Sequence, residues 1–171
     1  MARTTEQPAD LVRALPPQAR EIQGAAAGIV SRVVAGAIDY SVAGLLLVGL
    51  WLGVHGVRFL LRPRTFEWAE ADRIGSVTSY LVVFTIYLAF GWATTGRTIG
   101  DQVMGLRVLR ASGGRVHPIV ALGRAAFYAL FPLGLVWAAV DARRRSVQDL
   151  VLRTTVVYDW THRVPPGTDQ P

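Results

Sequence analysis

Residues 33–57 constrain the fold of this 171-residue chain more than any other segment, because this apolar run holds a single ionised side chain, Asp39. At a helical rise of about 1.5 Å per residue the run is roughly 37 Å long. A helix of that length crosses the hydrocarbon core of a bilayer with some tilt. Residues 74–95 form a second apolar segment without any charge. These features disfavour a soluble domain and predict an all-α membrane protein.

A third apolar segment, residues 119–140, is interrupted. It contains Arg124 near its start and Pro132 and Gly134 in its middle. Proline inside a helix removes a backbone hydrogen bond and kinks or breaks the helix. We therefore predict two transmembrane helices, within about 29–57 and 74–95, plus a third kinked or re-entrant segment. A continuous third crossing is the alternative.

Two short polar stretches have the composition of strands. They are GLRVLRA, at 105–111, and RTTVVYD, at 153–159, and a charged turn with a short helix precedes the second. The SGG that follows the first stretch indicates a turn. A lone strand would leave its backbone groups unpaired, so the two stretches are expected to form a small cytoplasmic two-strand β element.

The distribution of arginines predicts the topology. If the third segment returns to the side it left, thirteen arginines lie on the side of both termini and four lie in the loop at 58–73. If it crosses fully, the two sides hold eight and nine. Because cytoplasmic loops carry the excess of positive charge, the first arrangement is favoured and both termini are predicted to be cytoplasmic.

The flanking regions complete the predicted organisation. Residues 1–25 are polar and read as a flexible cytoplasmic tail, with a short amphipathic turn at 10–15. Residues 26–160 form the membrane domain, and 161–171 form a loose C-terminal tail. No small-residue cleavage pattern closes the first apolar run, so it is expected to remain as an anchor rather than act as a signal peptide.

Composition excludes several functions. The net charge of +6 does not predict nucleic-acid binding, because the arginines flank apolar segments and no aromatic ladder accompanies them. The chain has no cysteine and its three histidines are far apart, so we expect neither a metal nor a cofactor. The expected partners are the lipid bilayer, with anionic lipids at the RRR of 143–145, and a second copy or another membrane protein.

Asp39 is the principal candidate for a functional site. Gly28, Arg32, Ala35, Asp39 and Ala43 lie on one helical face. An unpaired charge at bilayer depth costs about 2.5 kcal/mol or more, so this carboxylate must be paired, protonated or hydrated. Two hypotheses follow: a packing ion pair with Arg32 or Arg124, or a group that binds a proton or a cation.

The other candidates have simpler alternatives. Arg32 and Arg124 either form pairs or extend to lipid phosphate. Asp149 is expected in a salt bridge on a surface helix, and Asp141 is expected to cap the third segment or to pair with Arg145. An aspartyl dyad needs two carboxyls within hydrogen-bonding reach, and Asp149 lies beyond the apolar segment, so an enzyme is not expected.

Two further residue sets are read as structural. Trp51, Trp92, Trp137 and Trp160 stand near segment ends and are expected to anchor the chain at the membrane interface. The glycines at 96, 100 and 105 are expected to serve turns and close packing, because no G-K-[ST] follows them.

Arg32, Asp39 and Asp149 together carry a resemblance. An arginine at the start of the first helix, an aspartate seven residues later and a late aspartate after a basic run resemble the RDD family of bacterial membrane proteins, over about residues 28–158. The stretch GRTIGDQVMGLRVLRASGGRV is similar to that family's linker, G-K-T-[LI]-G-x-x-x-x-G-L-R-V-V, with Arg97 in place of lysine. Arg153 stands where the family has the glycine of A-G-T.

The resemblance implies a multi-pass protein of the bacterial cell membrane, for which transport of unidentified ligands is the usual suggestion. We predict a transporter or transport subunit for a small ion or solute that uses Asp39. The alternative is a structural or accessory membrane protein whose Arg and Asp groups form a packing network. A transporter predicts a polar cavity reached by Asp39, and a structural protein predicts a closed ion-pair network.

Overall fold

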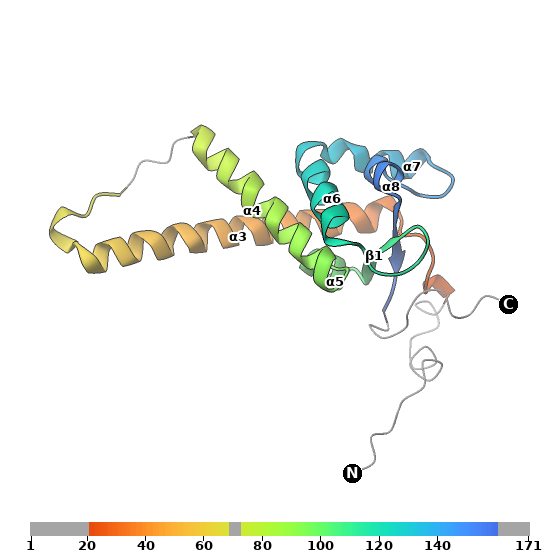
Figure 1. Ribbon diagram of the computed structural model, residues 1–171, viewed down its shortest axis with the longest axis horizontal. Coiled ribbons are helices and arrows are strands. Elements are labelled where there is room, and N and C mark those ends of the chain that lie inside the picture. The colour runs from red at the N-terminus through yellow and green to blue at the C-terminus, as the bar shows by residue number, and fades with distance from the viewer. Residues whose placement is uncertain (1–20, 69–72, 161–171) are drawn as a thin grey trace, which may run out of the picture.

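Two long apolar helices dominate the computed structural model, which describes residues 21–68 and 73–160. Helix α3 is Ile29–Leu61 and helix α4 is Arg73–Thr94, and both are long and apolar enough to cross a membrane. Helix α3 leads away from the end of the molecule that holds the shorter elements, and α4 leads back toward it (Figure 1). The two predicted helices are confirmed. Helix α3 continues past the predicted end at Val57 and ends at Leu61. It ends there because Pro63, the first residue of the short 3₁₀ helix η1 (Pro63–Thr65), forces the preceding Arg62 out of the helical conformation.

The third apolar segment is broken, as predicted. It consists of α6 (Pro118–Leu130), the 3₁₀ helix η2 (Pro132–Leu135) and α7 (Trp137–Val140), and the two parts are bent by 107°. Pro132 supplies no N–H at the break. The Gln148 side-chain amide donates to the Phe131 carbonyl at 2.9 Å, and a Cβ on Gly134 would lie 2.7 Å from Gln148 Nε2. Counted as one span, the bent pair gives a third candidate crossing.

The two predicted strands pair. Strand β1 (Leu106–Arg110) and strand β2 (Thr154–Tyr158) are antiparallel, with Leu106 opposite Tyr158. Helix α5 (Ile99–Val103) precedes β1, and helix α8 (Val147–Leu152) precedes β2. The other edge of β2 binds the chain before α3, because Ala27 N donates to the Val156 carbonyl at 2.9 Å. The sheet thus fixes the entrance of the first long helix.

The buried core is small and lies at the sheet end of the long helices. Phe84, Leu88 and Trp92 of α4 pack with Ala125 and Tyr128 of α6. The small-residue face predicted for the first helix turns inward, as the burial of its members shows: Arg32, Ala35, Gly36, Asp39 and Ala43. Most other large apolar side chains are exposed, as lipid contact requires.

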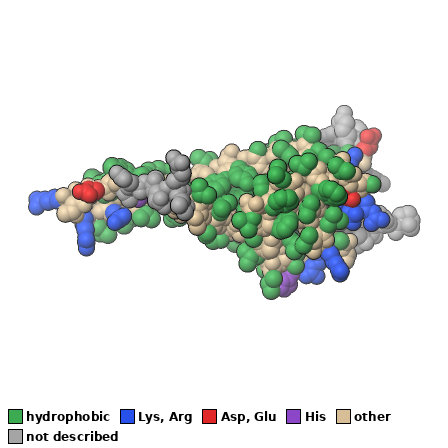
Figure 2. Space-filling model, turned by 90° about the horizontal axis from the view of Figure 1, so that it is seen from above, with side chains coloured by type: hydrophobic (Ala, Val, Ile, Leu, Met, Phe, Trp, Pro, Cys, Tyr) green, Lys and Arg blue, Asp and Glu red, His purple; other side chains and the backbone are tan. Residues whose placement is uncertain are grey.

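The type of side chain at the surface changes along the long axis of the molecule (Figure 2). Hydrophobic side chains cover the body, and arginines gather toward its two ends (Figure 2). The predicted amphipathic turn at 10–15 and the predicted tail at 161–171 lie outside the described residues.

Candidate functional site

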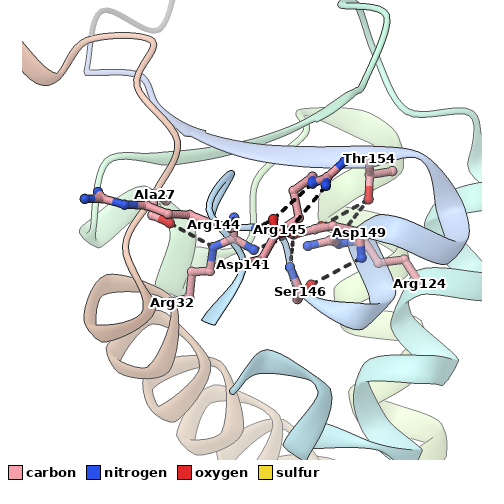
Figure 3. Close-up of polar contacts among 9 residues, drawn as sticks. All are labelled: Ala27, Arg32, Arg124, Asp141, Arg144, Arg145, Ser146, Asp149 and Thr154. Atoms are coloured by element: carbon pink, nitrogen blue, oxygen red, sulfur yellow. Dashed lines mark hydrogen bonds and ion pairs between the residues drawn. The ribbon is translucent and has the colours of Figure 1, made fainter. Parts of the chain in front are cut away.

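Three of the predicted residues meet in a buried cluster of two arginines and one aspartate (Figure 3). Arg32 of α3 donates from Nη1 to Asp149 Oδ2 at 2.5 Å. Arg124 of α6 donates from Nη1 to Asp149 Oδ1. All three side chains are at most 4% exposed. The alternative that these arginines extend to lipid phosphate is therefore wrong, and so is the placement of Asp149 on a surface helix.

The backbone of α8 prepares Asp149 for this contact. Ser146 caps α8 and accepts from Asp149 N at 3.2 Å, while Ser146 N donates back to Asp149 Oδ2 at 3.0 Å. This reciprocal pair is a capping box. Thr154 adds a hydroxyl to Asp149 Oδ1 at 3.2 Å. The carboxylate is held by two groups, Ser146 N and the Thr154 hydroxyl, before either arginine is counted.

Charge balance fixes Asp149 in its ionised form. Burial by itself would raise the pKa of Asp149, but the guanidinium groups of Arg124 and Arg32 hold that pKa well below its usual value. Arg32 also donates to the carbonyls of Ala27 and Arg144, at 3.2 and 2.8 Å. The cluster therefore joins α3, α6 and α8 through one ionised carboxylate.

Asp39 lies on the same face of α3 but has different partners. Its Oδ1 accepts from the Tyr87 hydroxyl at 2.7 Å and from Gly100 N at 2.8 Å. Its Oδ2 accepts from the Thr98 hydroxyl at 2.6 Å. Among the described residues no basic side chain bonds to it. The prediction of an ion pair between Asp39 and Arg32 or Arg124 is wrong, because Asp149 occupies both arginines.

The linker motif GRTIGD supplies two of the hydrogen-bond donors to Asp39, the Thr98 hydroxyl and Gly100 N. Thr98 caps α5 and accepts from Asp101 N at 3.1 Å, and Thr98 N donates to Asp101 Oδ2 at 3.2 Å. A Cβ on Gly100 would lie 2.1 Å from the Ala35 carbonyl oxygen and 2.8 Å from Asp39 Cγ. Only glycine allows α5 to approach α3 this closely. The expectation that this glycine serves close packing is confirmed.

A small cavity of about 20 Å³ lies between the two sets of charges. Its lining includes Asp39, Asp101, Arg32, Arg124 and Tyr128. A single water molecule needs about 10–15 Å³ of such space, so the cavity is the size of one water. It is polar and reached by Asp39, but it does not run through the helices.

Arg124 reaches this cavity from the other side. Its Cζ lies 4.9 Å from the centre of the Trp92 ring, and Trp92 Nε1 donates to Asp101 Oδ2 at 2.8 Å. Trp92 is 4% exposed, so its predicted role as an interface anchor is wrong. Arg124 Nε is buried and has no partner among the described residues.

Asp141, the remaining predicted residue, lies away from Asp39 and at the edge of the buried cluster. It accepts from Arg145 Nε at 3.1 Å and from Arg145 N at 3.0 Å, which confirms the predicted pairing. The hydrogen bonds from Arg145 lower the pKa of Asp141. This pair is partly exposed and closes the turn after α7.

Sequence reasoning missed the hydroxyl partners, Thr98, Tyr87 and Thr154, and the second cavity acid, Asp101. Two of these four residues, Thr98 and Asp101, carried a recognisable signal in the sequence. T-I-G-D at 98–101 and S-V-Q-D at 146–149 share the spacing of a capping box, which places the aspartate beside a helix start. Tyr87 carried no signal, because nothing local distinguishes it from the other aromatic residues of α4.

The apolar helices and this buried polar interior define a membrane protein built around internal arginine and aspartate contacts. The chain belongs to the RDD family, whose sequence model matches residues 26–153. Comparison with curated proteins and with solved structures found no match. Arg32, Asp39 and Asp149, which carried the resemblance to this family, thus belong to two separate contacts: Arg32 and Asp149 form an ion pair, and Asp39 accepts from uncharged donors.

Proposed function

We propose that the protein is a transporter or a transport subunit that couples the movement of a small ion or solute to reversible protonation of Asp39. The observation that carries this proposal is the chemistry of the Asp39 shell. Its Oδ2 bonds to a hydroxyl, Thr98 Oγ1, and hydroxyls can both donate and accept. A proton on Oδ2 can therefore be donated to Thr98, while Tyr87 and Gly100 continue to donate to Oδ1.

Asp149 provides the contrast within the same interior. Its charge is opposed by two guanidiniums that can only donate, so a proton there would leave two buried arginines without a counter-charge. Asp39 can exchange a proton without breaking an ion pair. Of the two aspartates in the family name, Asp39 has the shell suited to coupling and Asp149 the shell suited to holding helices together.

The alternative function is a structural or accessory membrane protein. It is favoured by the small size of the cavity beside Asp39, which accommodates one water, and by the binding of both Arg32 and Arg124 to Asp149. In that case Asp39 joins the linker to α3 and moves nothing.

The setting proposed for this function follows from the arginine distribution. We place the protein in a bacterial cell membrane with both termini and the β1–β2 sheet cytoplasmic. Arginines 143–145 would contact anionic lipid there. Two or three crossings are too few to enclose a gated path, so a second copy or a membrane protein partner is part of the proposal. No enzymatic activity is proposed.

The test compares Asp39→Asn with wild type in vesicles that contain a trapped pH-sensitive dye. Gradients of pH, Na⁺ and K⁺ are imposed, and the melting temperature is measured on the same preparation. We expect wild type to show flux, and Asp39→Asn to fold with a similar melting temperature but without flux. Asp141→Asn makes the same chemical change outside the Asp39 shell and should retain flux.

Two results would reject coupling. Wild type without flux under all three gradients removes the transport proposal, and a folded Asp39→Asn with wild-type flux removes the role of Asp39. A lowered melting temperature in Asp39→Asn together with unchanged flux would support the structural alternative.

A further inference from the structure

A groove at the far end of α3 lies outside the site described above. Its polar part, of about 800 Å³, is lined by residues of the α3 end and the following turn: Arg58, Leu61, Arg62, Thr65, Phe66, Glu67 and Trp68. Its apolar part is a separate pocket of about 410 Å³ between α3 and the first half of α4. The two pockets are neighbours, because Trp68 of the polar lining stacks on Trp51 of the apolar lining at a centroid distance of 5.3 Å. Leu47, Leu50, Val54, Val82 and Val83 provide the apolar lining.

Arg58 and Arg62 give the polar part its charge. Arg58 lies in the last turn of α3 and Arg62 is the residue that caps it, with Arg62 N donating to the Arg58 carbonyl at 3.0 Å. No described acidic side chain forms an ion pair with either of them. Between Arg32 and Arg58 the helix rises about 39 Å, close to the roughly 40–45 Å of a bilayer with its headgroups. Arg58 and Arg62 are thus at headgroup depth in the leaflet opposite the buried cluster.

His55 lies between the two parts of the groove. Its ring is 5% exposed and stacks with Trp51 and Trp68, at centroid distances of 4.2 and 5.7 Å. The ring Nδ1 donates a hydrogen bond to the Trp51 carbonyl at 2.9 Å. The other ring nitrogen, Nε2, is buried and has no partner among the described residues. Thr78 and Ser79 of α4 line the apolar part beside it.

We propose that this groove binds one phospholipid with an anionic headgroup. The order of chemistry along α3 matches that of a lipid. Two guanidiniums that pair with no described acidic side chain suit the phosphate, His55 with the hydroxyls of Thr78 and Ser79 suits the glycerol region, and the aliphatic side chains suit an acyl chain. Arginine is well suited to phosphate because its planar fork donates two parallel hydrogen bonds. The aromatic rings at 51, 66 and 68 lie at the depth where Trp and Phe accompany headgroups. This site does not depend on the function proposed for Asp39.

Native mass spectrometry of the full chain, purified in detergent and titrated with phosphatidylglycerol or phosphatidylcholine, tests the assignment. We expect a one-to-one complex that prefers phosphatidylglycerol. Arg58→Gln with Arg62→Gln should weaken it about 25-fold, from about fivefold per arginine near an anionic lipid. Arg64→Gln is the matched control, because Arg64 is in the same turn but does not line the groove.

A second variant tests the acyl part independently of charge. Val83→Trp should fill the apolar part and lower the bound fraction of both lipids. Inorganic phosphate should not reduce the binding of either lipid. Circular dichroism establishes that each variant is folded. Equal phosphatidylglycerol binding by wild type and the double arginine variant would overturn the proposal. So would equal binding of the two lipids, competition by inorganic phosphate alone, or a lipid-free dimer that buries the groove.

Discussion

Two aspartates in this protein show how neighbours decide the role of one residue type. Asp149 accepts from two guanidiniums, one backbone amide and one hydroxyl, whereas Asp39 accepts from two hydroxyls and one backbone amide. The first environment requires a charge and the second tolerates its loss. The sequence marked both aspartates, but it could not assign their partners, because Thr98 and Tyr87 are 59 and 48 positions from Asp39.

Replacing Asp149 with Asn should strongly destabilise the fold. Arg32 and Arg124 would remain buried without a counter-charge, a change that typically costs about 3–5 kcal/mol. Thermal melting in detergent should show a large drop for Asp149→Asn. Asp141→Asn breaks a partly exposed pair with Arg145 and should leave the melting temperature nearly unchanged. Equal effects for the two variants would contradict the assignment of the buried cluster.

The same cluster predicts sensitivity to acid. A second buried ion pair joins Asp159, which follows β2, to Arg97 at 2.5 Å. Burial alone would raise the pKa values of Asp149 and Asp159, but contacts with Arg124 and Arg32 for the first, and with Arg97 for the second, lower them. A lowered pKa in the folded state contributes stability above the unfolded value of about 3.9, and that contribution is lost as pH falls. The melting temperature should change little from pH 7 to 5 and fall below about pH 4. Asp149→Asn should show a smaller fall than wild type, and a wild-type curve that stays level to pH 3 would contradict this account.

At the scale of elements, two short helices place the polar groups and the long helices provide the surface. Helices α5 and α8 both begin with a capping box, and the aspartate of each box reaches into the interior. The long helices and the break at Pro132 could be predicted, since apolar length and proline act locally. The contact of Gln148 with the Phe131 carbonyl could not, because it joins segments that meet only after the third segment has turned back.

The end of α8 predicts a stabilising change. Arg153 has φ of 51° and is the left-handed residue that ends α8, a position where glycine is preferred. This conformation explains why a glycine there suits the family pattern. Arg153→Gly should raise stability by about 0.5–1 kcal/mol, because it removes the clash of Cβ with the backbone. Arg153→Ala keeps the Cβ and should not stabilise, so equal gains for the two variants in chemical denaturation would refute this explanation.

At the scale of the whole molecule, the strand pairing and the bend restrict how the chain can lie in a bilayer. Strand β1 precedes the third segment and β2 follows it, yet the two are hydrogen-bonded along their full length. A straight third helix would carry β2 to the far end of the helices, away from β1. The 107° bend instead allows the chain to return. The strand composition of the two segments predicted this pairing, because unpaired strand edges are costly. The backbone hydrogen bonds from residues 24–27 to the other edge of β2 were not predicted.

This geometry supports the last prediction, which concerns the two chain ends. The entrance of α3 and the end of β2 are joined by hydrogen bonds at Ala25 and Ala27, so the residues that precede α3 and those that follow β2 leave the same end of the molecule. Thirteen arginines belong to that side in the returning arrangement and four to the opposite loop, and this excess predicts a cytoplasmic location for both termini. A reporter fused before Met1 and one fused after Arg163 should therefore both be active in the cytoplasm, while one inserted after Arg64 should be active outside. Opposite locations for the two ends would require the sheet to be split across the membrane, and the returning third segment would then be wrong.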